Sequence, residues 1–263
     1  MAARKRPASA TTKKAAAKKA PAKKATKKKA ATTNAAARKA SDAPPRFNGW
    51  PAAAIDFYER LAADNSKTFW AANKEIYERD VRGPFESLDA EIEAEFGPMH
   101  IFRPYRDVRF SKDKTPYKEA QGGVTEGENG EHYYVAISAE GLMIGAGYWR
   151  MASDQLDRYR QAIDRGTAVA ALEKAVAAIE KKGYELGGEA LKTAPRGYPR
   201  DHPNVRWLRH KGLHAWKVFG TPAWVSTRTC FTRVTEGWRT PQPLYDWLTE
   251  HVGPSELPPE DWG

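Results

Sequence analysis

Apolar residues recur at helical spacing over the first part of the folded region, between residues 55 and 96. Three stripes follow one another: Ile55, Tyr58 and Leu61; then Phe69, Asn73 and Ile76, with Trp70, Tyr77 and Val81 beside them; then Phe85, Leu88, Ile92 and Phe96. Between the first two stripes, Asp64-Asn65-Ser66 supplies a turn and a helix cap. Gly83 ends the second stripe, and Pro84 suits the first turn of a helix. The pattern predicts three consecutive helices.

The middle of the chain changes to the alternation that is typical of strands. In residues 132–138, Tyr133, Val135 and Ile137 alternate with smaller or polar neighbours, and Glu140-Gly141 provides a turn into residues 142–149. This pattern predicts an antiparallel hairpin.

Gly145 and Gly147 leave one face of the second strand without side chains. Something must then pack or bind closely there, and we expect packing. Gly122-Gly123 and residues 126–130 are expected to form loops within the same sheet.

Helical spacing returns in the second half of the chain. It covers a segment after Ser153, residues 167–182, a segment after Pro222 whose threonines also permit a strand, and a last helix around Trp247. Helices on both sides of an antiparallel hairpin predict an α+β fold. We expect a tail and linker over residues 1–45, one cooperatively folding α+β domain over residues 46–253, and a C-terminal extension over residues 254–263.

Charge divides the chain unevenly. The 263 residues carry a net charge of +10, but residues 1–40 hold fourteen Lys or Arg and no acidic residue. The rest has 29 basic and 33 acidic residues, so the high basicity belongs to the N-terminal segment. Because that segment has almost no apolar area to bury, we expect it to be disordered.

The basic segment resembles the Lys/Ala/Pro tails of linker histones and bacterial histone-like proteins. Its clustered lysines are Lys13, Lys14, Lys18, Lys19, Lys23, Lys24, Lys27, Lys28 and Lys29. Lysines that neutralise phosphates release counterions, whatever the base sequence. The segment therefore predicts DNA or RNA as a partner; a solubilising extension is the alternative, and a membrane surface is disfavoured because no apolar anchor accompanies the lysines.

Composition also excludes several protein classes. No apolar run is long enough to span a bilayer, no signal peptide follows the basic N-terminus, and the single Cys230 excludes a disulfide framework. We expect a soluble, cytoplasmic protein that associates with the nucleoid. No cofactor motif or metal site is predicted; His210 and His214 lack a carboxylate at matching spacing.

Two cationic, proline-constrained segments are the candidate ligand site. In residues 103–118, Val108 and Phe110 could bury on one strand face while Asp107 and Arg109 point the other way. The candidate residues of both segments are Arg103, Arg106, Asp107, Arg109, Lys112, Asp113, Lys114, Tyr117, Lys118, Lys192, Arg196, Tyr198 and Arg200. Guanidinium and ammonium groups bind phosphate, so we expect the segments to meet at one phosphate-bearing ligand.

At these segments the sequence resembles a known family. RDVRFSKDKTPYK, LKTAPRGYPRDHP, FYERLAADNSKTFWAANKEIYE and PLYDWL are similar, in this order, to domain of unknown function 2461, a conserved hypothetical bacterial family. The resemblance covers residues 47–252 and implies no activity.

Three functions stay open at this point. The chain is a nucleic-acid-associated protein whose domain binds an anionic ligand, an enzyme acting on a phosphorylated or nucleotide-like substrate, or a structural or protein-interaction domain. In the enzyme, Asp107 or Asp113 would be the general base, in a concave pocket beside the arginines. In the third case the basic loops dock on an acidic partner. A structural alternative for the loops is that Arg106, Arg109 and Asp107 form internal ion pairs that hold the sheet to the acidic helices.

Overall fold

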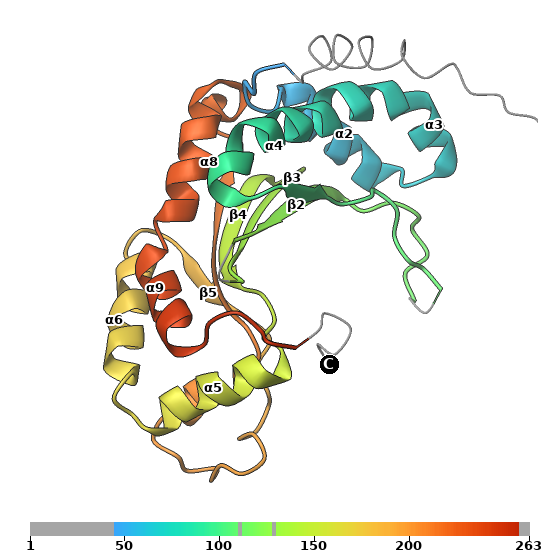
Figure 1. Cartoon of the computed structure of the whole chain (residues 1–263). Coiled ribbons are helices and arrows are strands. Elements are labelled where there is room, and N and C mark those ends of the chain that lie inside the picture. Colours follow the sequence, from blue (N-terminus) through green and yellow to red (C-terminus); the bar gives the residue numbers. More distant parts are fainter. Residues whose placement is uncertain (1–44, 110–111, 128–129, 258–263) are drawn as a thin grey trace, which may run out of the picture. The chain divides into compact units, whose positions relative to one another are not determined.

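A computed structural model describes residues 45–109, 112–127 and 130–257, and the chain divides into two units, Met1–Ala43 and Pro44–Gly263. The lysine-rich segment and its expected disorder lie outside the described residues. In chain order the elements are α2 (Ala52–Ala63), α3 (Lys67–Ile76), the π-helix η1 (Tyr77–Arg82), α4 (Gly83–Phe96), β1 (Met99–Ile101), β2 (Ala120–Glu126), β3 (His132–Ser138), β4 (Gly141–Tyr148), α5 (Ser153–Asp164), α6 (Val169–Glu180), β5 (Glu185–Gly187), α7 (Val205–Leu208), β6 (Leu213–Gly220), the 3₁₀ helix η2 (Ala223–Ser226), α8 (Thr229–Arg239) and α9 (Gln242–His251) (Figure 1).

The strands form one antiparallel sheet of six in the order β1-β2-β3-β4-β6-β5. The predicted hairpin is β3–β4, and it pairs Val135 with Ile144. Helices precede and follow the sheet, so the predicted α+β class is confirmed. None of the described helices has the length and apolar character needed to span a bilayer.

The first helices are present, but the second and third are not separated at Gly83. α3, η1 and α4 follow one another without a break from Lys67 to Phe96. Pro84 stands in the first turn of α4, directly after the wider π turn of η1. Glycine and proline therefore mark a change of helix type here and not the end of the helix.

One face of the sheet carries the hydrophobic core. Val135, Ile137, Leu142 and Ile144 are completely buried on this face. α2 contacts β3, and α8 and α9 contact β4, so the helices cover these side chains (Figure 1).

The other face carries a row of residues that crosses all six strands. Residues paired across antiparallel strands point to the same face. The pairs join, in order, His100, Val124, Tyr134, Gly145, Trp216 and Glu185. Val218 follows Trp216 by two positions in β6 and therefore points to the same face. Its side chain is 45% exposed, so apolar surface remains open on this face.

Two sequence expectations about the strands are wrong. Gly122 and Gly123 lie inside β2 and not in a loop. The described residues around Asp107 form no strand; only an isolated bridge pairs Tyr105 with Tyr117. The Asp107 carboxylate accepts from the Arg109 N–H, and such local side-chain bonds compete with strand pairing.

Candidate functional site

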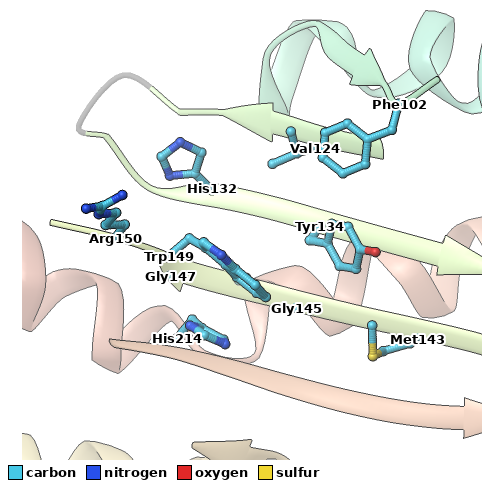
Figure 2. Close-up of a pocket in the computed structure, with 11 residues that line it drawn as sticks. Phe102, Val124, His132, Tyr134, Met143, Gly145, Gly147, Trp149, Arg150 and His214 are labelled. Carbon is cyan, nitrogen blue, oxygen red and sulfur yellow. The ribbon is translucent and has the colours of Figure 1, made fainter. Parts of the chain in front are cut away.

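A cleft of about 430 Å³ lies on the open sheet face (Figure 2). Four strands contribute to its lining: β2 with Val124, β3 with His132 and Tyr134, β4 with Met143, Gly145 and Gly147, and β6 with His214. Phe102, directly after β1, and Trp149 and Arg150, directly after β4, also line it. Most of these side chains are aromatic or apolar. Cavities of this size and character accommodate small molecules.

Glycines shape the floor of the cleft. Gly145 pairs with Tyr134 on one side and Trp216 on the other, and carries no side chain between them. Gly147 has φ +134°, and a Cβ there would lie 2.6 Å from the Leu213 carbonyl oxygen. This close contact is with the neighbouring strand β6, whereas the bare face of Gly145 and Gly147 lines the open cleft, so the expectation that packing covers this face is wrong for the described residues.

Aromatic rings stand along the cleft. The Trp149 indole stacks on the His214 imidazole, with ring centroids 4.2 Å apart and planes at 19°. Tyr134 lies 6.2 Å from Trp149 and 6.3 Å from Phe102, centroid to centroid. Because Trp149 is 58% exposed, much of its ring surface is still available for contact.

Two imidazoles place polar atoms among these rings. The Nδ1 atoms of His132 and His214 are buried and have no hydrogen-bond partner among the described residues. Burial, and secondarily the nearby His210, lowers the pKa of His214 to about 4. His214 is therefore neutral at neutral pH, and a neutral imidazole has one donor and one acceptor nitrogen.

The first predicted segment, residues 103–118, folds back on itself. Arg106 pairs with Asp113 and donates to the Thr115 hydroxyl, 2.6 Å away. Arg109 pairs with Asp107 at 2.6 Å, and Lys114 donates to a backbone carbonyl. Since both aspartates hold arginines, neither is placed as the general base that the enzyme hypothesis required.

The end of this segment is fixed to the first helices. The Tyr117 ring is buried and stacks on Trp70, with 4.2 Å between centroids and 7° between planes. Asn65 exchanges two hydrogen bonds with the Tyr117 backbone. Lys118 places its ammonium 5.2 Å from the Phe102 centroid, next to the cleft, whereas Arg103 and Lys112 are exposed.

The second predicted segment forms a hollow of its own. This basic hollow, about 250 Å³, is lined by Lys192, Thr193, Ala194, Arg200, Val205 and Arg209. None of these six lining residues is acidic. Arg196 is exposed outside the lining, and Tyr198 is half-buried, with its ring nearly perpendicular to that of His202.

The structure does not bring the two segments together. The first follows β1 and the second follows β5, and these strands are the two edges of the sheet. Figure 1 accordingly shows the β1–β2 connection beside α3 and the segment before β6 near α5. The expected single site made by both segments is therefore not formed.

Sequence reasoning missed the cleft as a site. In the sequence, only Gly145 and Gly147 pointed to this place. His132, Trp149 and Arg150 were not singled out as candidate binding residues. The residues come from four strands, so no local motif contains them.

The comparisons identify the domain. Residues 53–247 match the family described as "Conserved hypothetical protein (DUF2461)", inside the range of the resemblance noted in the sequence. The search of curated proteins and the search of solved structures each found no match.

Proposed function

Because the chain belongs to the DUF2461 family, whose description states no activity, we propose a function from the chain's own residues: it is a nucleic-acid-associated protein. The lysine-rich segment binds DNA or RNA, and the folded domain adds an anion site at the basic hollow. The observation that carries the second part is the clustering of Lys192, Arg200 and Arg209 around one concave surface.

The framework of the basic hollow supports this proposal. Leu191 N–H donates to the Arg209 carbonyl at 2.8 Å, and Ala190 and His210 form a bridge, so the two sides of the hollow are joined. The Arg209 Nε donates to the Leu191 carbonyl and holds that guanidinium in place. A charged group that is already held loses less entropy when it binds a ligand.

The anchoring of the segment to α5 supports it as well. Asn204 donates to the Ile163 carbonyl at 3.3 Å, and the His202 ring lies 3.2 Å from the Asp164 carboxylate. An arginine fork and a lysine ammonium on such a fixed base suit a phosphate group.

Phosphate titration of the full chain tests the hollow. At a phosphate concentration ten times its Kd, a bound anion should stabilise the fold by about 1.4 kcal/mol. The double variant Lys192→Ala/Arg200→Ala should lose this stabilisation in thermal unfolding. The control Lys181→Ala/Arg165→Ala removes two exposed cations elsewhere and should keep it. If phosphate stabilises neither wild type nor control, the hollow is no anion site, and the interaction-domain alternative is favoured.

Deletion of residues 1–40 tests the lysine-rich segment. Fourteen cations leave with it, so duplex affinity should fall strongly, and the plot of log affinity against log salt should become flatter. The folded remainder carries more acidic than basic residues and is expected to keep little affinity by itself. An unchanged affinity and slope would contradict nucleic-acid binding by this segment.

A further inference from the structure

The cleft on the open sheet face has a flat, bare floor bordered by aromatic rings. Gly145 and Gly147 supply backbone without side chains, and Tyr134 and Trp149 stand beside them (Figure 2). One ring face of Trp149 is taken by His214, and more than half of the residue is exposed. A planar ring system can extend this stack and lie against the peptide groups of the floor.

A buried nitrogen restricts the chemistry of that ring system. His214 lies against one face of Trp149, so a ring stacked on the other face does not reach its nitrogens. His132 also lines the cleft, and its Nδ1 is buried and has no hydrogen-bond partner among the described residues. A pure hydrocarbon would leave this nitrogen without a hydrogen bond, which is costly in an apolar site. The occupant must therefore present hydrogen-bonding atoms at its edge.

Size agrees with one ring system and a small substituent. The cleft holds about 430 Å³, toward the lower end of the range for small-molecule sites. An imidazole nitrogen can donate or accept a hydrogen bond, which suits the edge of a nitrogen heterocycle, where donors and acceptors occur side by side.

We propose that this cleft binds a planar nitrogen heterocycle of nucleobase size, stacked on the face of Trp149 opposite His214 and hydrogen-bonded to the imidazole of His132. This site is separate from the basic hollow and does not depend on the proposed anion binding. The heterocycle can belong to a free nucleoside or to a base in a single strand, since both present the same ring.

Calorimetric titration of the full chain tests the proposal with adenosine and naphthalene. Both are planar bicyclic systems, but only adenosine has nitrogens at its edge. We expect adenosine to bind at least tenfold more tightly than naphthalene. Equal affinities, or no adenosine binding, would overturn the proposal.

Two variants locate the binding. Trp149→Ala removes the stacking surface from an exposed position, and we expect at least a tenfold loss of adenosine affinity. Trp224→Ala, which removes a half-buried indole outside the cleft lining, should leave affinity unchanged. His132→Phe keeps an aromatic ring and should reduce the preference for adenosine over naphthalene. If Trp149→Ala binds adenosine as wild type does, the proposal is wrong, whether or not His132→Phe folds.

A short oligoadenylate distinguishes the two sources of the ring. Trp149→Ala should weaken its binding as it weakens that of adenosine if strand bases enter the cleft. If Trp149→Ala affects adenosine alone, the cleft takes the free nucleoside. Either result supports binding of a heterocycle in the cleft. If Trp149→Ala weakens the binding of neither adenosine nor the oligoadenylate, the proposal is overturned.

Discussion

Glu91 forms an ion pair with Arg228, with 2.7 Å between the Glu91 Oε2 and the Arg228 Nη2. Glu91 lies in α4, and Arg228 stands directly before α8. The Glu91 carboxylate also accepts from the Phe47 N–H at 2.6 Å, and Arg228 donates to the Phe47 carbonyl at 2.8 Å. One carboxylate thus ties the beginning of the described domain to two helices.

Removing this charge should destabilise the domain in a pH-dependent way. Burial acts to raise the pKa of Glu91, but hydrogen bonds from Arg228 and Phe47 outweigh it and leave the pKa below its ordinary value of 4.5. A lowered folded pKa gives stability that is present above the unfolded value and is lost as the pH falls through the folded one. We expect Glu91→Gln to cost about 1–3 kcal/mol at pH 7 and less below pH 4.5.

A second ion pair between the same helices supplies the control. Glu95 pairs with Arg239 at 2.6 Å, but both side chains are about half exposed. Glu95→Gln should therefore cost less than about 1 kcal/mol in urea unfolding at pH 7. Equal losses for the two variants would show that the Phe47 contacts add nothing.

The lowered pKa of His214 predicts a second pH effect. Burial, followed by the nearby His210, brings the folded pKa to about 4, against an ordinary value of 6.5. Between these values the unfolded chain binds a proton that the folded chain does not, so stability falls as the pH drops. The slope from this group is at most about 1.4 kcal/mol per pH unit.

His214→Gln should flatten the plot of unfolding free energy against pH between 6.5 and 5. The pKa of His210 is also lowered, chiefly by burial, so part of the slope remains in the variant. A variant slope equal to that of wild type would show that His214 is not held neutral in the fold.

Gly147→Ala tests the close approach of β4 and β6. The added Cβ would lie 2.6 Å from the Leu213 carbonyl oxygen, at a φ of +134°. We expect a loss of about 2–4 kcal/mol in thermal unfolding. Gly197→Ala, at φ +92° with no atom within 4 Å of the new Cβ, is the matched control and should cost about 1–2 kcal/mol. Similar losses would show that the strands separate easily.

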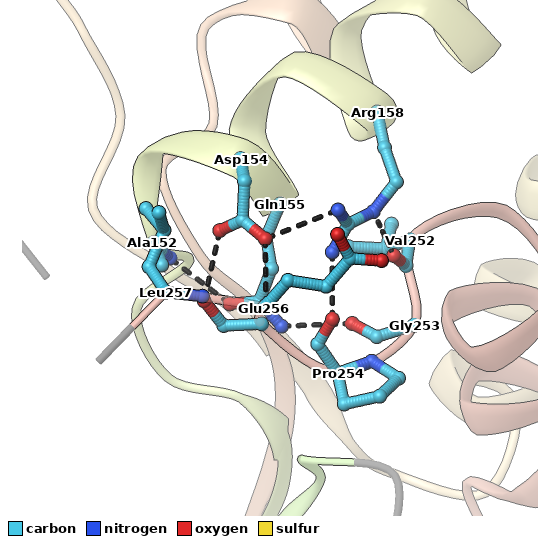
Figure 3. A network of polar contacts seen from close by, with 10 residues as sticks. Ala152, Asp154, Gln155, Arg158, Val252, Gly253, Pro254, Glu256 and Leu257 are labelled. Atoms are coloured by element: carbon cyan, nitrogen blue, oxygen red, sulfur yellow. Dashed lines mark hydrogen bonds and ion pairs between the residues drawn. The ribbon is translucent and has the colours of Figure 1, made fainter. Parts of the chain in front are cut away.

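Arg158 fastens the segment after α9 to α5 (Figure 3). Its guanidinium donates to the carbonyls of Val252, at 2.5 Å, and Pro254, at 2.7 Å, while Asp154 accepts from it and from the Glu256 N–H. Arg158→Ala should speed hydrogen exchange at residues 252–257 and lower stability by about 1–3 kcal/mol. The exposed Arg165→Ala should do neither. Unchanged exchange in Arg158→Ala would contradict this role.

Helices and the central hairpin could be predicted because their burial follows a local period. β1 and β5 have three residues each and are too short to show a period. β6 was not predicted because Lys217 interrupts the alternation of apolar and polar residues along this strand. The Lys217 ammonium donates to the Lys182 carbonyl and lies 5.2 Å from the Tyr184 centroid, so a charged residue stands opposite the core residue Ile144 in the sheet.

The site was harder to predict for a different reason. Trp149 and His214 are 65 positions apart in sequence and meet only because β6 pairs with β4. The cationic segments were recognisable as chemistry, but their sequences do not reveal which edge of the sheet each one leaves. Ion pairs of Arg106 and Arg109 with the acidic helices were among the alternatives, but both arginines pair with aspartates of their own segment, Asp113 and Asp107.

The strand order has a consequence for the growing polypeptide. β5 pairs only with β6 in the described sheet, and Glu185 lies opposite Trp216. At synthesis rates of roughly 5–20 residues per second, the 31 residues from position 186 to 216 take about 2–6 s. During that interval β5 has no strand to join, and β4 presents an unpaired edge that a neighbouring nascent chain could occupy. The domain is thus most vulnerable to misassembly after its hairpin is complete and before residue 216 has emerged.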